Sequence, residues 1–80
     1  MTAETDAPEP ADLLRALYDE TIARDALFAG HDVLMKRLGI EKVAFSRLRA
    51  ALDREGFLDR GVVGMDRLSS FGIRHVEERL

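Results

Sequence analysis

Apolar residues recur at helical spacing in four segments of the chain, and glycines separate most of these segments. The first segment begins at Pro10, a residue suited to the first turn of a helix, and we expect its helix to run to about residue 25. The stripe that would face inward consists of Leu13, Leu14, Leu17, Tyr18 and Ile22. Residues 26–29 either continue this helix or form a short strand before Gly30. The pattern therefore predicts an amino-terminal helix with one buried face.

The next two segments predict a short helix, a turn and a longer helix. The short helix begins at His31 or Asp32 and runs to Leu38, where Gly39 is placed to adopt the left-handed conformation that ends a helix. The longer helix spans about residues 41–55 and ends before Gly56. Its inward stripe consists of Phe45, Leu48 and Leu52. This succession is the pattern of a helix-turn-helix unit, whose second helix often enters a groove of DNA.

The last part of the chain predicts a β-hairpin and a final helix. One strand begins at residues 57–58, a turn lies between Gly61 and Gly64, and residues 65–69 return as the second strand. A serine at position 69 or 70 can cap the final helix. Its apolar positions are Ile73, Val76 and Leu80. We therefore expect a mainly α-helical fold with a small β-hairpin: a three-helix core, the hairpin and a carboxy-terminal helix.

Length and composition indicate one small soluble domain. Of the 80 residues, 46% are hydrophobic and 34% charged, as in globular proteins. Residues 1–9 are small, acidic and without periodicity, so we expect a disordered tail before a folded domain at residues 10–80. The chain has no cysteine. It shows neither a membrane-spanning apolar run nor a signal peptide, so we expect no membrane partner and a cytoplasmic location.

Positive charge is concentrated on the predicted helix-turn-helix. The formal net charge is −3, which argues weakly against nucleic-acid binding. In residues 33–49, however, Glu41 is the single acid. The bases of this segment are Lys36, Arg37, Lys42, Arg47 and Arg49. A phosphate backbone responds to such a local field rather than to net charge.

Several short runs resemble a known family. They are Leu38-Gly39-Ile40, Phe45-Ser46-Arg47-Leu48 and the run LDREGFL at 52–58. Together these are similar to the "LGI…vsraLrrLeekGlI" run of bacterial and archaeal winged helix domains. Leu68-Ser69 with Gly72-Ile73 and Val76-Glu77 resembles the "LT..Gi.ylE" segment that leads from the wing into the last helix of that family. The resemblance covers about residues 12–80 and implies a winged helix-turn-helix fold, which serves transcription regulators, protein-interaction modules and dimerisation units.

The resemblance implies contacts with double-stranded DNA. Arg47 and Ser46 match positions that touch DNA in regulators of this family, and Lys42 matches a position at the helix entry. Helical spacing places Val43, Ser46, Arg47, Ala50 and Arg54 opposite the inward stripe. The candidate DNA-binding residues are thus Lys42, Val43, Ser46, Arg47, Arg54 and, beside the hairpin turn, Arg60. Our first hypothesis is a small DNA-binding transcriptional regulator that reads two half-sites as a homodimer.

An alternative hypothesis is a winged helix protein-interaction module that does not bind DNA. Val43 and Ala50 on the outward face suit a protein partner as well as DNA. The apolar turn residues Val62 and Val63 either pack under the hairpin or contact another chain. For a second copy, the candidate interface lies on the last helix and consists of Ile73, Val76 and Leu80.

Nothing in the sequence indicates an enzyme, a cofactor or a metal site. His31 and His75 have no second ligand at metal spacing, and we interpret His31 as the polar start of its helix. No nucleophile, base and orienting group form a catalytic set, and no glycine-rich phosphate loop is present. We interpret Lys36, Arg37 and Arg49 as solvated residues that complement helix dipoles, in preference to the alternative of phosphate contacts.

Overall fold

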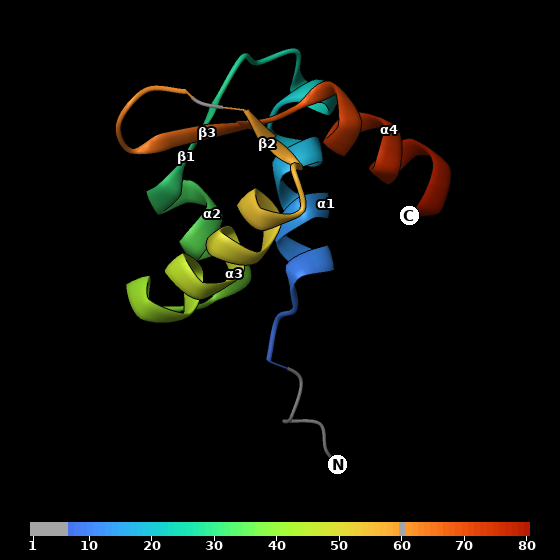
Figure 1. The fold of residues 1–80 in the computed structure, drawn as a ribbon. Helices are drawn as coiled ribbons and strands as arrows, with labels where there is room; N and C mark the ends of the chain where they lie inside the picture. Colours follow the sequence, from blue (N-terminus) through green and yellow to red (C-terminus); the bar gives the residue numbers. More distant parts are fainter. Residues whose placement is uncertain (1–6, 60) are drawn as a thin grey trace.

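Four α-helices and a small antiparallel sheet make up the structure, a computed structural model that describes residues 7–59 and 61–80 (Figure 1). In chain order the elements are α1 (Pro10–Glu20), the 3₁₀ turn η2 (Ile22–Arg24), β1 (Ala29–Gly30), α2 (His31–Leu38), α3 (Lys42–Arg54), β2 (Leu58–Asp59), β3 (Met65–Leu68) and α4 (Ser70–Arg79). The predicted mainly helical fold with a small hairpin is confirmed in this form. Most of the predicted tail lies outside the described residues, and Glu9 already caps α1.

The sheet has three strands in the order β1-β3-β2, all antiparallel. Ala29 pairs with Asp66 and Gly30 with Met65, while Leu58 pairs with Leu68 on the other side of β3. Figure 1 shows the sheet lying across one end of the helices. Of the two alternatives for residues 26–29, the short strand is therefore the better one, although it begins only at Ala29. Side chains alternate along β3, so Asp66 and Leu68 point inward and are buried.

The predicted extent of the first helix was wrong. The helix α1 ends at Glu20, where the buried Thr21 donates its hydroxyl to the carbonyl of Leu17 at 2.6 Å. A 3₁₀ turn follows and stops at Asp25, which has a left-handed φ of 59°. Ile22 consequently leaves the inward stripe and is 43% exposed. A hydroxyl that binds a carbonyl one turn back competes locally with helix continuation.

The turn between α2 and α3 has the predicted geometry. Gly39 adopts φ 67°, and Ile40 donates its amide to the carbonyl of Met35 at 3.1 Å. This is the hydrogen bond of a helix that ends on a left-handed residue followed by an apolar one. The helix α3 then starts within one residue of the predicted position, with Phe45 and Leu52 buried. The helix-turn-helix is therefore well defined by local sequence.

The last helix is fixed to the loop before β2 by Ser69 and Gly72. The Ser69 hydroxyl accepts the Gly72 amide at 3.0 Å, as a helix cap does, and donates to the carbonyl of Gly56 at 2.7 Å. A Cβ at Gly72 would lie 2.4 Å from the carbonyl oxygen of Phe57. The predicted cap is confirmed, and α4 approaches the chain so closely that only glycine fits there.

The hydrophobic core surrounds α1, which contacts α2, α3, α4 and β3. Its buried apolar residues are Leu13, Leu14, Ala16, Leu17, Ala29, Leu34, Phe45, Leu52, Leu68 and Val76. Tyr18 and Leu48, both predicted to face inward, are partly buried and pack against this cluster. The core therefore lies behind α3 and leaves the opposite face of that helix to solvent.

Candidate functional site

The face of α3 that points away from the core carries the predicted candidate residues. The candidates Val43, Ser46, Arg47 and Arg54 lie there and are exposed, as is Ala50, while Lys42 is exposed at the entry of the helix. The buried Phe45 and Leu52 occupy the opposite side of the same helix. Because residues three and four apart share a helix face, the core contacts of α3 determine which side chains remain outside.

Three exposed basic side chains of α3 have no partner among the described residues. Among the described residues, no ion pair or side-chain hydrogen bond involves Lys42, Arg47 or Arg54. Their charges are therefore available to an external anion. Arg60, the remaining base among the predicted DNA contacts, lies outside the described residues.

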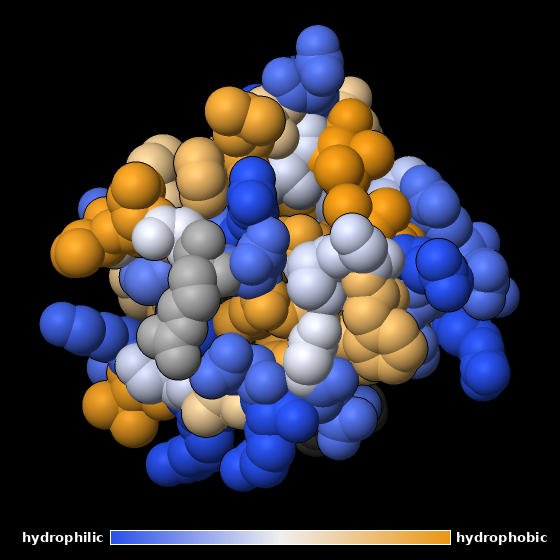
Figure 2. Space-filling model, turned by 45° about the horizontal axis from the view of Figure 1, so that its top comes forward, coloured by the Kyte–Doolittle hydropathy of each residue, from blue (hydrophilic) through white to orange (hydrophobic). Residues whose placement is uncertain are grey.

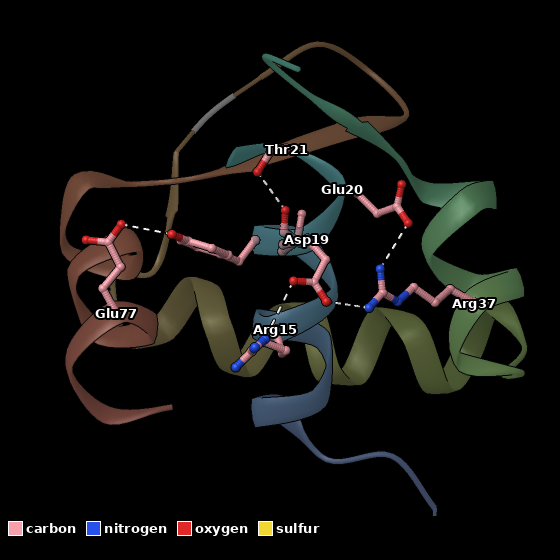
Figure 3. A network of polar contacts seen from close by, with 8 residues as sticks. Arg15, Asp19, Glu20, Thr21, Arg37 and Glu77 are labelled. Atoms are coloured by element: carbon pink, nitrogen blue, oxygen red, sulfur yellow. Dashed lines mark hydrogen bonds and ion pairs between the residues drawn. The ribbon is translucent and has the colours of Figure 1, made fainter. Parts of the chain in front are cut away.

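Arg37, at the end of α2, behaves differently. Its guanidinium reaches back to α1, where it donates to Asp19 and, at 3.0 Å, to Glu20 (Figure 3). These hydrogen bonds, with the Asp19 contact the stronger, raise the pKa of Arg37 above its ordinary value. The interpretation of Arg37 as a merely solvated residue was therefore wrong, because the acidic end of α1 lies beside it in the fold. This arginine fixes α2 to α1.

Arg49 was also misinterpreted, because it is bound to a buried carboxylate. Its Nε donates to Oδ2 of Asp66 at 2.6 Å and its Nη2 donates to Oδ1 at 2.8 Å. These hydrogen bonds raise the pKa of Arg49 despite partial burial, which acts in the opposite direction. Asp66 is 1% exposed, so its charge depends on such partners. The pair joins β3 directly to α3.

His31 completes this cluster. It is the first residue of α2, as predicted, but its ring is not simply solvated: Nε2 lies 2.9 Å from Oδ2 of Asp66. The ring also lies 5.0 Å from that of Phe45, centroid to centroid. We call His31, Arg49 and Asp66 the Asp66 cluster. Sequence reasoning missed it, although the alternation of Asp66 with Leu68 along a strand was a usable sign that this carboxylate faces inward.

A groove lies where α2, α3 and the hairpin turn meet. The amide of His31 donates to the carbonyl of Gly64 at 2.9 Å and so holds the turn beside the start of α2. The groove encloses about 450 Å³. Its lining consists of His31, Asp32, Met35, Lys42, Phe45, Ser46, Arg49 and Gly64. The candidate residues Lys42 and Ser46 therefore lie at the edge of a depression shared by three elements.

The hairpin turn exposes its two valines. Val62 is 55% and Val63 fully exposed, so they do not pack under the hairpin. Figure 2, which views the sheet end of the molecule, shows apolar side chains in separate groups among charged ones rather than as one continuous patch. The turn is thus a small apolar projection beside the groove.

The predicted interface on the last helix is only partly a surface. Val76 is 4% exposed and belongs to the core, so its assignment to a contact with a second chain was wrong. Ile73 packs against the same core, whereas Leu80 is exposed. The i, i+3 spacing that suggested an interface is the stripe by which α4 packs on the chain itself. Tyr18 of α1 adds a polar link, donating its hydroxyl to Glu77 at 2.9 Å (Figure 3).

Other kinds of site find little support in the part of the chain that the structure describes. There, no three potential ligands among His, Asp and Glu gather closely enough to hold a metal ion. Within the same residues, no helix has the length and apolar character needed to cross a membrane. Comparison with protein families, curated proteins and solved structures finds no match to this chain. The geometry of α3 and its surroundings therefore carries the functional argument.

Proposed function

We propose that this chain is a DNA-binding winged helix protein and that α3 is its recognition helix. The order of elements, with β1 before the helix-turn-helix and the β2–β3 hairpin after it, supports the winged helix layout. In this arrangement α3 enters the major groove while the hairpin lies beside it. A lone module of this size offers few base contacts, so we further propose a homodimeric regulator that reads two half-sites.

The observation that carries this proposal is the division of the basic residues. Arg37 and Arg49 are held by carboxylates of the chain itself, whereas Lys42 and Arg47 on α3 have no ion-pair partner among the described residues. Arginine can bind a guanine edge with two hydrogen bonds or grip a phosphate. Beside these bases, Ser46 can donate to a phosphate and Val43 can contact a thymine methyl.

The test is fluorescence anisotropy of labelled mixed-sequence duplex DNA at about 50 and about 200 mM salt. With about three phosphate contacts, affinity falls about 40-fold over this fourfold change in salt. Arg47→Ala is expected to weaken binding to this mixed-sequence duplex and to lower the slope of log affinity against log salt by about one, because one phosphate contact is lost. Arg74→Ala is the matched control, because Arg74 is an exposed arginine on α4, away from the α3 face. Equal affinity for both variants and the parent chain would refute the role of Arg47.

A second candidate function is protein binding through the hairpin turn. The specific observation in its favour is the exposure of Val62 and Val63, since a hairpin that enters a DNA groove usually offers basic residues. This candidate predicts partner binding that survives Arg47→Ala but is lost when both valines are replaced by glutamate. If duplex DNA does not bind at the lower salt, partner capture with these variants becomes the next experiment.

A further inference from the structure

The attachment of the hairpin to the helices is ionic near its turn and apolar near its base. Along β3 the inward positions are Leu68, which lies in the core, and Asp66, which lies one step closer to the turn. Among the polar contacts of the described residues, the Arg49–Asp66 pair is the one that joins β3 to α3. The direction of the hairpin relative to α3 therefore depends on this pair, in addition to the backbone contacts of Gly64 with His31 and of β3 with β1.

An ion pair is not the most stabilising choice for a buried position. Apolar residues of similar volume often stabilise a fold as well or better, because two charges do not then have to leave water. A carboxylate held by two parallel hydrogen bonds from a guanidinium differs from an apolar contact in having a defined direction. Asp66 also contacts His31 at the start of α2, so this one carboxylate connects β3, α3 and α2.

We propose that Asp66 is a positioning residue: through Arg49 and His31 it holds the hairpin at a fixed angle to α3, so that hairpin, groove and α3 form one preformed binding face. The use of such a face rests on the proposed function, which is DNA binding. The contacts of Asp66 that position the hairpin do not depend on that function. A preformed face avoids the entropic cost of ordering the hairpin when DNA binds. The contacts of Asp66 with Arg49 and His31 lie beneath the groove, because both of these partners line the groove.

The main experiment separates positioning from stability. In the double variant Arg49→Met/Asp66→Leu the ion pair is replaced by apolar side chains, and we expect the urea midpoint to match or exceed that of the parent chain. The ¹⁵N order parameters of the amides at 62–66 are expected to fall from about 0.85 to below about 0.6, whereas those of α3 stay high. The affinity for duplex DNA is expected to fall about tenfold.

The control is Arg67→Met/Asp59→Leu. This pair has the same charges and lies in the same hairpin, at 3.0 Å, but joins β2 to β3 and does not reach α3. It is expected to leave the order of the turn unchanged. Arg49→Lys is a second variant, which keeps the charge and removes the two-bond geometry. A positioning role predicts that the Arg49→Lys chain stays folded while the order parameters at 62–66 fall. A role of charge alone predicts that these order parameters equal those of the parent chain.

The results distinguish this inference from the proposed function. Unchanged order parameters at 62–66 in the double variant, or full rescue of these order parameters in Arg49→Lys, would overturn the positioning role, whether or not DNA binds. Absence of DNA binding by the parent chain, together with a loosened turn in both variants, would refute the proposed function and leave the positioning role supported. A loosened turn with the predicted loss of affinity supports both.

Discussion

Two regions of this molecule are held together in different ways. Around α1 the contacts are apolar, with Leu13 and Leu17 completely buried, and the cap at Ser69 docks α4 against the loop before β2. Where β3 meets α3, a carboxylate and its two partners make the contact instead. Apolar packing supplies most of the free energy of folding but has no direction, whereas the ionic contact has direction and adds little net stability. The comparison teaches that the stability of this fold and the orientation of its candidate binding face have separate sources.

The largest effect is expected in the apolar region. Leu17→Ala leaves a cavity in the core around α1, and we expect it to lower the free energy of unfolding by about 2–5 kcal/mol. Urea unfolding followed by circular dichroism at 222 nm measures this loss. The control is Leu27→Ala, because Leu27 is 74% exposed and its truncation is expected to cost less than about 0.5 kcal/mol. Equal losses in the two variants would contradict the described core.

A smaller effect is expected from a single change in the ionic region. Asp66→Asn keeps the shape of the side chain, removes its charge and replaces one of its two acceptor oxygens with an NH2 donor, so Arg49 keeps at most one of its two hydrogen bonds. We expect a loss of about 1–3 kcal/mol, less than for a fully buried pair because the Arg49 side chain is 40% exposed. The same unfolding measurement applies. A loss above about 3 kcal/mol would show that the two regions do not differ as described.

The close approach of α4 gives a test of backbone packing. Alanine normally favours a helix over glycine by about 1 kcal/mol, but a Cβ at Gly72 meets the carbonyl of Phe57. We therefore expect Gly72→Ala to destabilise the chain by about 1–3 kcal/mol. Gly30→Ala is the control, since its Cβ would come no closer than 4.0 Å to Val33. Stabilisation by Gly72→Ala would show that α4 sits farther from this loop.

The smallest effect concerns Tyr18, the only tyrosine of a chain without tryptophan. Its hydrogen bond to Glu77, helped by partial burial, raises its pKa above the ordinary 10.0. A raised pKa means that the folded chain holds this proton more tightly than the unfolded chain does, so the stabilisation is full below pH 10 and disappears as the pH rises through the folded value. Absorbance at 295 nm against pH reads the titration directly.

Glu77→Ala is expected to return the pKa of Tyr18 towards its ordinary value, while Glu78→Ala, the neighbouring acid on the same helix, is expected to leave it raised. Equal midpoints for the two variants would show that Glu77 is not the acceptor of this hydrogen bond.

Local spacing was sufficient to predict the helix-turn-helix, the left-handed Gly39, the cap at Ser69 and the hairpin. Each of these depends on residues a few positions apart. The outward face of α3 also followed from spacing, and its contact with DNA stays a prediction. What spacing could not supply were contacts between distant segments. The end of α1 depends on Thr21, whose burial is a tertiary property, and the partners of Asp66 come from two other elements. Val76 was misplaced because a helical stripe does not reveal what it packs against.

The pairing of β1 with β3 has a consequence for the order in which the chain assembles. Ala29 must find Asp66 across the whole helix-turn-helix, and contacts between such distant positions form late because the intervening loop has to close first. The contacts within α2 and α3 are local and can form first, so the candidate binding face is completed only when β3 pairs with the strand that precedes these helices.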